Sequence, residues 1–261
     1  MDYSRSARNF GGAVLAGMAA LGLASCERID TDRPESSRAF PEPHRPVSNL
    51  GSNQFSTEDA RDSRGEAQEV MDLAGIEQGM TVADIGAGNG YYTVRLAERV
   101  GEKGRVLAQD IDRDALERLG RRVVRENFAN VSIKPGAEDD PRLPEGSFDR
   151  IFLVHMYHEV AEPYPFLWRL RPALAKGGRV IVVETDRPTD RHGMPPGLLF
   201  CEFERVGFRL TQFTRKPEIA GYYAQFEATG TRPAPEDIES CSEADSESEA
   251  AGIEGKGRAK A

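Results

Sequence analysis

The sequence is poor in cysteine and carries no excess of positive charge. Its three cysteines, Cys26, Cys201 and Cys241, lack the short spacings that are typical of metal-binding cysteine motifs. The formal net charge is −9 at pH 7, which excludes the basic footprint that a nucleic-acid groove requires. We therefore expect no nucleic-acid partner and no metal site built from cysteine. A chain of 261 residues is long enough for one buried core with polar tails.

The sequence also lacks an obvious permanent membrane span. The apolar stretch at residues 10–24 is too short to cross a bilayer comfortably, and it follows two arginines. It closes with Leu23-Ala24-Ser25-Cys26, which resembles the cleavage box of bacterial lipoproteins. The resemblance implies that residues 1–25 are a signal peptide and that a lipidated Cys26 anchors the chain to a membrane, in the periplasm-facing cell envelope. The alternative is a cytoplasmic protein whose first residues form a frayed helix.

Two polar stretches flank the region that is expected to fold. Residues 26–55 mix both signs of charge with four prolines and are expected to form a disordered tether. Residues 231–261 are rich in acids and are expected to form a disordered tail. Cys241 lies in this tail, whereas Cys201 is expected to be buried in a helix. We therefore expect the two thiols to stay unpaired, although an oxidising compartment would permit a disulfide.

Residues 82–100 combine an apolar run, a glycine turn and an amphipathic helix. The glycines of the turn are Gly86, Gly88 and Gly90. A strand, a sharp turn and a helix in this order form a cradle for a ligand, and a side chain on the turn would hold the ligand away from the backbone. The pattern G-x-G-x-x-G of dinucleotide-binding folds is incomplete, because Tyr91 occupies the third glycine position.

The spacing D-x-G-x-G-x-G from Asp84 to Gly90 resembles motif I of the class I S-adenosylmethionine-dependent methyltransferases. The resemblance implies that Asp84 lies near the methionine ammonium of the cofactor. It also implies that the loop of Gly86, Ala87 and Gly88 runs beside the carboxypropyl arm.

A second acid follows the next apolar run. Asp110, with Ile111 beside it, ends this run and is placed to accept hydrogen bonds from both ribose hydroxyls of an adenosine ligand. Many members of the family place a further acid against the adenine amine, but the aligned position here holds Ala137. Glu138 or Asp139 is expected to serve after a shift of one residue, and a solvated acidic loop is the alternative.

Two histidines follow the apolar run at residues 150–154, in a segment that resembles motif IV of the same family. His155 and His158 leave the carboxyl end of this predicted strand, where open α/β sheets bind ligands. Either could take a proton from a hydroxyl or thiol acceptor, and a structural role is the alternative. The pair could also bind a metal, but no third ligand is evident, so no metal site is expected. His192 is more simply explained as a loop residue than as a residue that binds the acceptor.

Ser56 or Thr57 is expected to cap a helix that runs to about Ala74, with Asp62, Arg64 and Glu66 on its solvated face. Within residues 56–230 the order of strands and helices predicts a doubly wound, Rossmann-like α/β domain. Its sheet is expected to have seven mostly parallel strands with an antiparallel last strand, and helices on both faces.

The resemblance implies a methyltransferase that uses S-adenosylmethionine and acts on a small-molecule or lipid-like acceptor, at oxygen or sulfur. This cofactor is made in the cytosol, whereas the first 25 residues predict export. The second hypothesis is therefore a membrane-anchored envelope lipoprotein whose Rossmann-like domain binds a ligand without turnover. The oligomeric state is not predicted.

Overall fold

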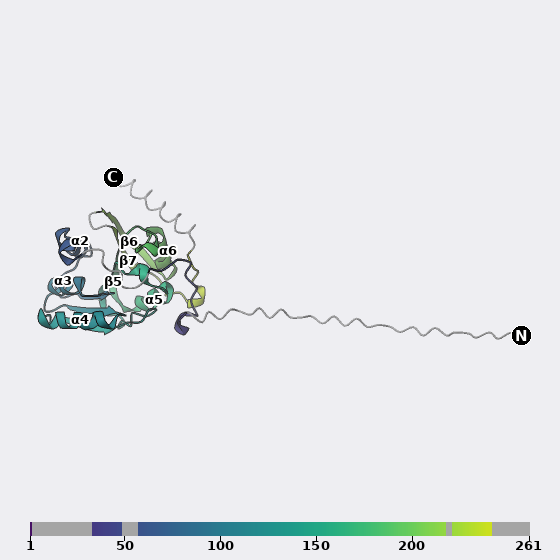
Figure 1. Cartoon of the computed structure of the whole chain (residues 1–261), viewed down its shortest axis with the longest axis horizontal. Helices are drawn as coiled ribbons and strands as arrows, with labels where there is room; N and C mark the ends of the chain where they lie inside the picture. Colours follow the sequence, from purple (N-terminus) through teal and green to yellow (C-terminus); the bar gives the residue numbers. More distant parts are fainter. Residues whose placement is uncertain (2–32, 49–56, 218–220, 242–261) are drawn as a thin grey trace. The chain divides into compact units, whose positions relative to one another are not determined.

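A computed structural model describes residues 1, 33–48, 57–217 and 221–241 (Figure 1). The predicted signal peptide, Cys26 and the tail beyond residue 241 lie outside the described residues. Within the described part of the chain, no helix is long and apolar enough to cross a bilayer.

A single seven-stranded sheet forms the centre of the domain, with the strand order β3-β2-β1-β4-β5-β7-β6. The strands are β1 (Thr81–Ile85), β2 (Arg105–Asp110), β3 (Val131–Pro135), β4 (Phe148–Val154), β5 (Leu174–Glu184), β6 (Phe208–Lys216) and β7 (Gly221–Ala228). β1 to β5 are parallel to one another, whereas β7 runs antiparallel to both of its neighbours, β5 and β6. The predicted fold class is therefore confirmed, including the antiparallel last strand.

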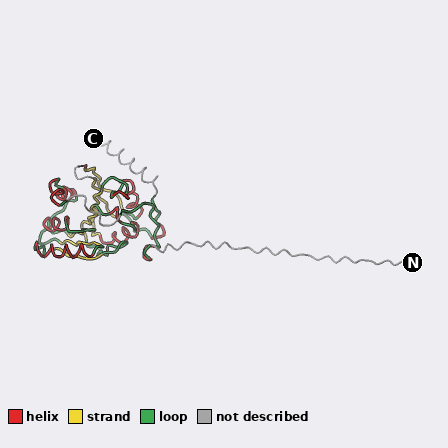
Figure 2. The backbone as a smooth tube through the Cα atoms, in the orientation of Figure 1, coloured by secondary structure: helices red, strands yellow, loops and turns green. Residues whose placement is uncertain are grey.

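The helices that cover this sheet are α1 (Glu58–Ser63), α2 (Glu66–Leu73), α3 (Tyr91–Val100), α4 (Arg113–Arg125), α5 (Pro163–Leu170) and α6 (Pro196–Arg205). Short 3₁₀ turns are η1 (Glu35–Ser37), η2 (Tyr157–Glu159), η3 (Arg171–Ala173), η4 (Thr189–Arg191) and η6 (Pro235–Asp237). Figure 2 shows the strands lying between the helices.

The core lies on both faces of the sheet, because consecutive residues of a strand point to opposite sides. On β4, Ile151 and Leu153 pack with residues of α5 and α6, whereas Phe152 packs with residues of α2 and α3. In Figure 1, α2, α3 and α4 accordingly lie on one side of the sheet and α5 and α6 on the other. All three β4 side chains are fully buried, which is why the strand reads as a continuous apolar run.

The helix predicted from residue 57 to about Ala74 is interrupted. Its cap is confirmed, since the hydroxyl of Thr57 accepts a hydrogen bond from the amide of Ala60. Gly65 then adopts a left-handed conformation, with φ at 66°, and separates α1 from α2. The expected solvated face is wrong for Glu66, because the turn at Gly65 directs this carboxylate inward, where only 1% of the residue is exposed.

The prediction of a disordered tether is wrong for residues 33–48, which we call the N-terminal strap. The guanidinium of Arg33 forms an ion pair with Glu162 at 2.6 Å, and the ring of Phe40 packs edge-on against Trp168. Arg45 is buried and donates a hydrogen bond to Glu202 at 2.7 Å. The strap folds because the domain supplies distant partners for its charges, and its own apolar content alone would not suffice.

The prediction for the C-terminal tail is also wrong, as far as residue 241. Ile238 is buried, and the indole of Trp168 donates a hydrogen bond to the carbonyl of Pro233. Cys201 and Cys241 form a disulfide, with 6.1 Å between their Cα atoms. The two thiols meet because residues 231–241 pack against α5 and α6, where the amide of Cys241 donates to the hydroxyl of Tyr164.

Candidate active site

A cavity of about 1510 Å³ opens at the carboxyl ends of β1, β2 and β4. The chain winds outward in both directions from β1 and β4, so this is the topological switch point at which open α/β sheets bind ligands. One end of the cavity is lined by the glycine turn after β1 and by Asp110. The other end is lined by His155, His158 and His192, with Val47 and Ser48 of the N-terminal strap.

Glycine is required in the turn for two different reasons. Gly86, Gly88 and Gly90 all have positive φ, at 68°, 53° and 85°. A Cβ on Gly90 would lie 2.3 Å from the side chain of Leu119, and one on Gly86 would lie 2.8 Å from Met156. No atom lies within 4 Å of a Cβ built on Gly88, which therefore keeps the loop open toward the cavity.

Asp84 is buried beneath the glycine turn. Its carboxylate is 3% exposed and accepts a hydrogen bond from the hydroxyl of Thr93 at 2.5 Å, and the residue is absent from the cavity lining. Burial raises the pKa of Asp84 to about 6, and the hydrogen bond from Thr93 opposes this. The hydrogen bond from Thr93 ties β1 to α3 on either side of the glycine turn, and a place for Asp84 near the methionine ammonium stays a prediction.

Asp110 lies where it was expected. One of its carboxylate oxygens accepts a hydrogen bond from the amide of Gly88 at 2.8 Å, and the other accepts from the amide of Asp112 at 2.9 Å. Each oxygen keeps a further lone pair, so the carboxylate can also accept two hydroxyls. Ile111 and Ala87 line the cavity beside it, as predicted.

The loop after β3 separates the two acids that were considered for the adenine amine. The carboxylate of Asp139 accepts hydrogen bonds from Ser37 at 2.8 Å and from Arg169 at 2.7 Å, which engages it with the N-terminal strap. Glu138 and Asp139 both line the cavity, but only the carboxylate of Asp139 is tied to the strap by the hydrogen bonds given above. The geometry therefore favours Glu138 over Asp139 as the residue that meets a ligand.

His155 belongs to a buried charged cluster that sequence reasoning missed. Its Nε2 lies 3.6 Å from Glu66, whose carboxylate also pairs with Arg61 at 2.5 Å. The Arg61 guanidinium in turn lies 3.8 Å from the centre of the Tyr91 ring. Burial would raise the pKa of Glu66, but His155 and Arg61 together lower it to about 2. The one local signal for this cluster in the sequence is Gly65, because a glycine at this position can interrupt the helix just before Glu66.

We expect the contribution of Glu66 to stability to be lost in acid. Its pKa falls from 4.5 to about 2 on folding, so the contribution is complete above pH 4.5 and disappears as the pH falls toward 2. The difference in unfolding free energy between the wild type and Glu66→Gln should shrink by about 3 kcal/mol over this interval. Urea denaturation at several pH values measures it, with the exposed Glu77→Gln as control. A difference that stays constant with pH would contradict the assignment.

His158 is held by a carboxylate from the neighbouring strand. Its Nδ1 lies 2.9 Å and 3.0 Å from the two oxygens of Glu184, the last residue of β5, which is fully buried. Burial would lower the pKa of His158, but Glu184 raises it. An ionised Glu184 can only accept hydrogen bonds, so it holds the proton on Nδ1 and leaves the lone pair of a neutral imidazole on Nε2.

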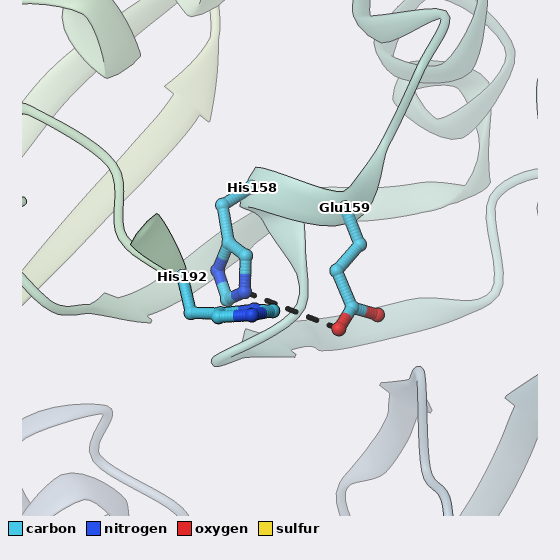
Figure 3. Close-up of side chains that lie close together, drawn as sticks. All are labelled: His158, Glu159 and His192. Carbon is cyan, nitrogen blue, oxygen red and sulfur yellow. Dashed lines mark ion pairs between the residues drawn. The ribbon is translucent and has the colours of Figure 1, made fainter. Parts of the chain in front are cut away.

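Figure 3 shows that Glu159 and His192 lie beside this imidazole. The Nε2 of His158 lies 4.0 Å from Glu159, and the rings of His158 and His192 are 5.7 Å apart, centre to centre. His192 has a positive φ of 52°, and its amide donates to the hydroxyl of Ser48 at 3.0 Å. A metal site built from His155 and His158 would need both histidines around one ion. In the structure His155 instead lies beside Glu66, whereas His158 lies beside Glu159 and His192. The structure therefore supplies two other potential ligands.

The described residues form a Rossmann-like α/β domain with a cavity at the switch point of its sheet. Residues 76–197 match the family model described as a methyltransferase domain. The chain is 31% identical over 121 residues to a ubiquinone/menaquinone biosynthesis C-methyltransferase, UbiE, of Idiomarina loihiensis, and 32% identical over 122 residues to that of Salmonella arizonae. Both matches cover 46% of this chain and 48% of the relative, so the chain spans about half the length of the curated relatives it matches.

Among solved structures, a SAM-dependent methyltransferase from Aquifex aeolicus superposes with a TM-score of 0.58 at 24% identity. The match covers 65% of this chain and 92% of that protein, and it shows the shared fold. Residues 76–197 therefore resemble a methyltransferase domain in sequence, and the described residues share the fold of a SAM-dependent methyltransferase. The family and fold imply S-adenosylmethionine as the cofactor, and the open loop at Gly88 and the two remaining lone pairs of Asp110 fit its nucleoside.

Proposed function

We propose that this protein transfers the methyl group of S-adenosylmethionine to a small-molecule or lipid-like acceptor, at oxygen or sulfur. The observation that carries the proposal is one cavity with two chemically different ends. The glycine turn with Asp110 suits the adenosine, and the end beside His158 suits the acceptor. The cavity lining also includes apolar side chains, among them Val47, Met156 and Phe166, which favour an apolar acceptor. The relatives' name, a C-methyltransferase of ubiquinone and menaquinone biosynthesis, agrees with such an acceptor and adds carbon as an alternative acceptor atom.

The cofactor supplies a methyl group that is already electrophilic on its positively charged sulfur. The chain's part is to align the acceptor for in-line attack and to exclude water. A bond forms between the acceptor atom and the methyl carbon while the methyl–sulfur bond breaks, and its electron pair stays on sulfur. The acceptor's proton would pass to the lone pair on Nε2 of His158. We assign the catalytic role to His158 rather than to His155, because His155 is already engaged by Glu66, which also pairs with Arg61.

Calorimetry tests the cofactor half of the proposal. Asp110→Ala should weaken binding of S-adenosylmethionine at least about tenfold, because two hydrogen bonds to a charged group are lost. Asp114→Ala, at an exposed position of the same helix–turn region, should bind as the wild type does. NAD should bind more weakly than S-adenosylmethionine, since the third glycine of the dinucleotide pattern is absent. Equal affinity of the Asp110→Ala variant and the wild type would contradict the placement of the ribose.

The proposed compartment is the bacterial cell envelope, with the chain anchored through a lipidated Cys26. Support comes from the disulfide between Cys201 and Cys241, because disulfides persist in oxidising compartments and are rare in the cytosol. The mass of the intact protein from the membrane fraction should lack residues 1–25 and include added acyl chains. A chain that retains these residues in the soluble fraction would favour the cytoplasmic alternative.

The second candidate function is a membrane-anchored lipoprotein that binds a ligand without turnover. The observation that favours it is the same disulfide, since export would separate the domain from the cytosol, where S-adenosylmethionine is made. Under this alternative, S-adenosylmethionine or a related adenosine ligand would still bind, but no methyl group would be transferred.

A further inference from the structure

We propose that His158, Glu159 and His192 form a binding site for one divalent transition-metal ion, such as Zn²⁺, at the acceptor end of the cavity. Each side chain offers one ligand atom, and the three atoms lie within 4.8 Å of one another (Figure 3). Two imidazoles and a carboxylate are a ligand set that zinc uses in catalytic sites, where a fourth position stays open. Here the open position would face the cavity that all three residues line.

The three ligand atoms would have to move closer together to bind one ion. The ligand atoms of a tetrahedral zinc ion lie roughly 3.3 Å apart, because each is about 2.0–2.2 Å from the metal. The Nε2 of His158 and the nearer oxygen of Glu159 are 4.0 Å apart. His158 and Glu159 are neighbours in η2, whereas His192 follows η4, so the side chains of Glu159 and His192 would both have to move closer to His158 around one ion.

A separate observation points to a metal ligand at His158. Glu184 holds Nδ1 at 2.9 Å and is fully buried, whereas Nε2 lies toward Glu159 and His192. Histidines that bind metals almost always donate their other ring N–H to such an outer carboxylate or carbonyl, which fixes the tautomer and strengthens the ligand. A satisfied structural histidine would not need two neighbouring side chains with ligand atoms around its second nitrogen.

The local charge also suits a divalent cation. Glu159 and Glu184 bring two carboxylates to a single imidazole. The buried Arg45 donates to the backbone carbonyl of His158, but its own ion pair is with Glu202 at 2.7 Å. Two carboxylates beside one imidazole attract a cation.

The catalytic role of this metal rests on the proposed methyltransferase function, whereas its binding does not. An acceptor hydroxyl or thiol in the open position would lose its proton to cavity water, because a metal lowers the pKa of a bound group. The oxygen or sulfur would then form its bond to the methyl carbon as the methyl–sulfur bond of the cofactor breaks. In this arrangement the lone pair of His158 binds the metal and does not take the proton itself.

Metal titration tests the site with the full-length protein after treatment with a chelator and dialysis. We expect one equivalent of Zn²⁺ per chain by calorimetry and elemental analysis, and visible absorption typical of tetrahedral coordination when Co²⁺ replaces it. His192→Ala and Glu159→Gln should each weaken zinc binding at least about tenfold, since even outer partners of metal ligands have effects of this size. His44→Ala removes an exposed histidine outside the site and should change nothing.

Absence of stoichiometric zinc binding would overturn the proposal, as would full binding by both the His192→Ala and Glu159→Gln variants. Calorimetry with S-adenosylmethionine shows whether each variant is folded, because its binding site lies at the other end of the cavity. Zinc binding in a protein that transfers no methyl group would uphold the metal site and count against the proposed function. Methyl transfer by a protein that binds no zinc would overturn the metal site and uphold the proposed function.

Discussion

Replacement of His158 by glutamine is expected to lower the rate of methyl transfer by about 10²–10⁴-fold, the range that is typical for loss of a positioned acid–base group. Glutamine retains polarity and similar length but offers no imidazole lone pair at the position of Nε2. His158 is 3% exposed and is oriented by Glu184, so no other side chain can take its place without rearrangement. The loss is expected whether the lone pair meets the acceptor directly or through a metal. The release of S-adenosylhomocysteine in single turnovers with an apolar acceptor fraction measures the rate.

The matched control for this prediction is His44→Gln, at an exposed position of the N-terminal strap. Both variants should bind S-adenosylmethionine with the affinity of the wild type, because neither residue lies at the glycine turn. Glu184→Gln should lower the rate less than His158→Gln, since it disturbs the orientation of the imidazole without removing it. Wild-type turnover in the His158→Gln variant would remove this residue from the mechanism.

Replacement of Arg45 by alanine is expected to lower the free energy of unfolding by about 3–5 kcal/mol. The side chains of Arg45 and Glu202 are 3% and 1% exposed and are 2.7 Å apart, so the variant leaves Glu202 as a buried charge without its partner. Arg45 also donates to the carbonyls of Tyr157 and Val160, which ties the N-terminal strap to the segment that carries His158. Urea denaturation measures the loss.

Arg38→Ala, at an exposed position of the same strap, is the matched control and should change stability by less than about 0.5 kcal/mol. Arg45→Met combined with Glu202→Leu should recover much of the loss, since a buried ion pair can often be replaced by apolar residues of similar volume. An Arg45→Ala variant that is as stable as the wild type would show that the strap contributes little to the fold.

The sheet and the cofactor end of the site could be predicted because their signals are local. The apolar run before Asp84 and the glycine turn predict β1 and the cradle that follows it. Asp112 caps α4, since its carboxylate accepts hydrogen bonds from the amides of Asp114 and Ala115. Position at a strand end also correctly brought Asp110 and His158 to the cavity.

The N-terminal strap and the residues after 230 could not be predicted from composition, because their partners are far away in the chain. Arg33 is 129 residues from Glu162, and Arg45 is 157 residues from Glu202. A polar sequence with many prolines is typical of a linker, and no local pattern distinguishes a linker from a segment whose charges are paired by the domain. The disulfide was not predicted for the same reason, because Cys201 and Cys241 are 40 residues apart in the chain.

The partner of His158 had a signal that could have been used. Glu184 ends the apolar run of β5, and His158 follows the end of β4, the adjacent parallel strand. Carboxyl ends of adjacent parallel strands meet at one edge of a sheet, so an acid and a histidine at these ends are candidates for contact. The place of His192 beside them depends on a loop conformation with positive φ, for which the sequence carries no comparable signal.

Transfer of a labelled methyl group tests the account most directly. The purified protein is incubated with S-adenosylmethionine labelled in the methyl group and with a fraction of apolar small molecules from a bacterial envelope, alongside the His158→Gln variant. We predict that the label enters a small molecule, that an equal amount of S-adenosylhomocysteine accumulates, and that the variant forms little of either. Binding of the cofactor with no more product than a protein-free blank would contradict the account and favour the ligand-binding lipoprotein.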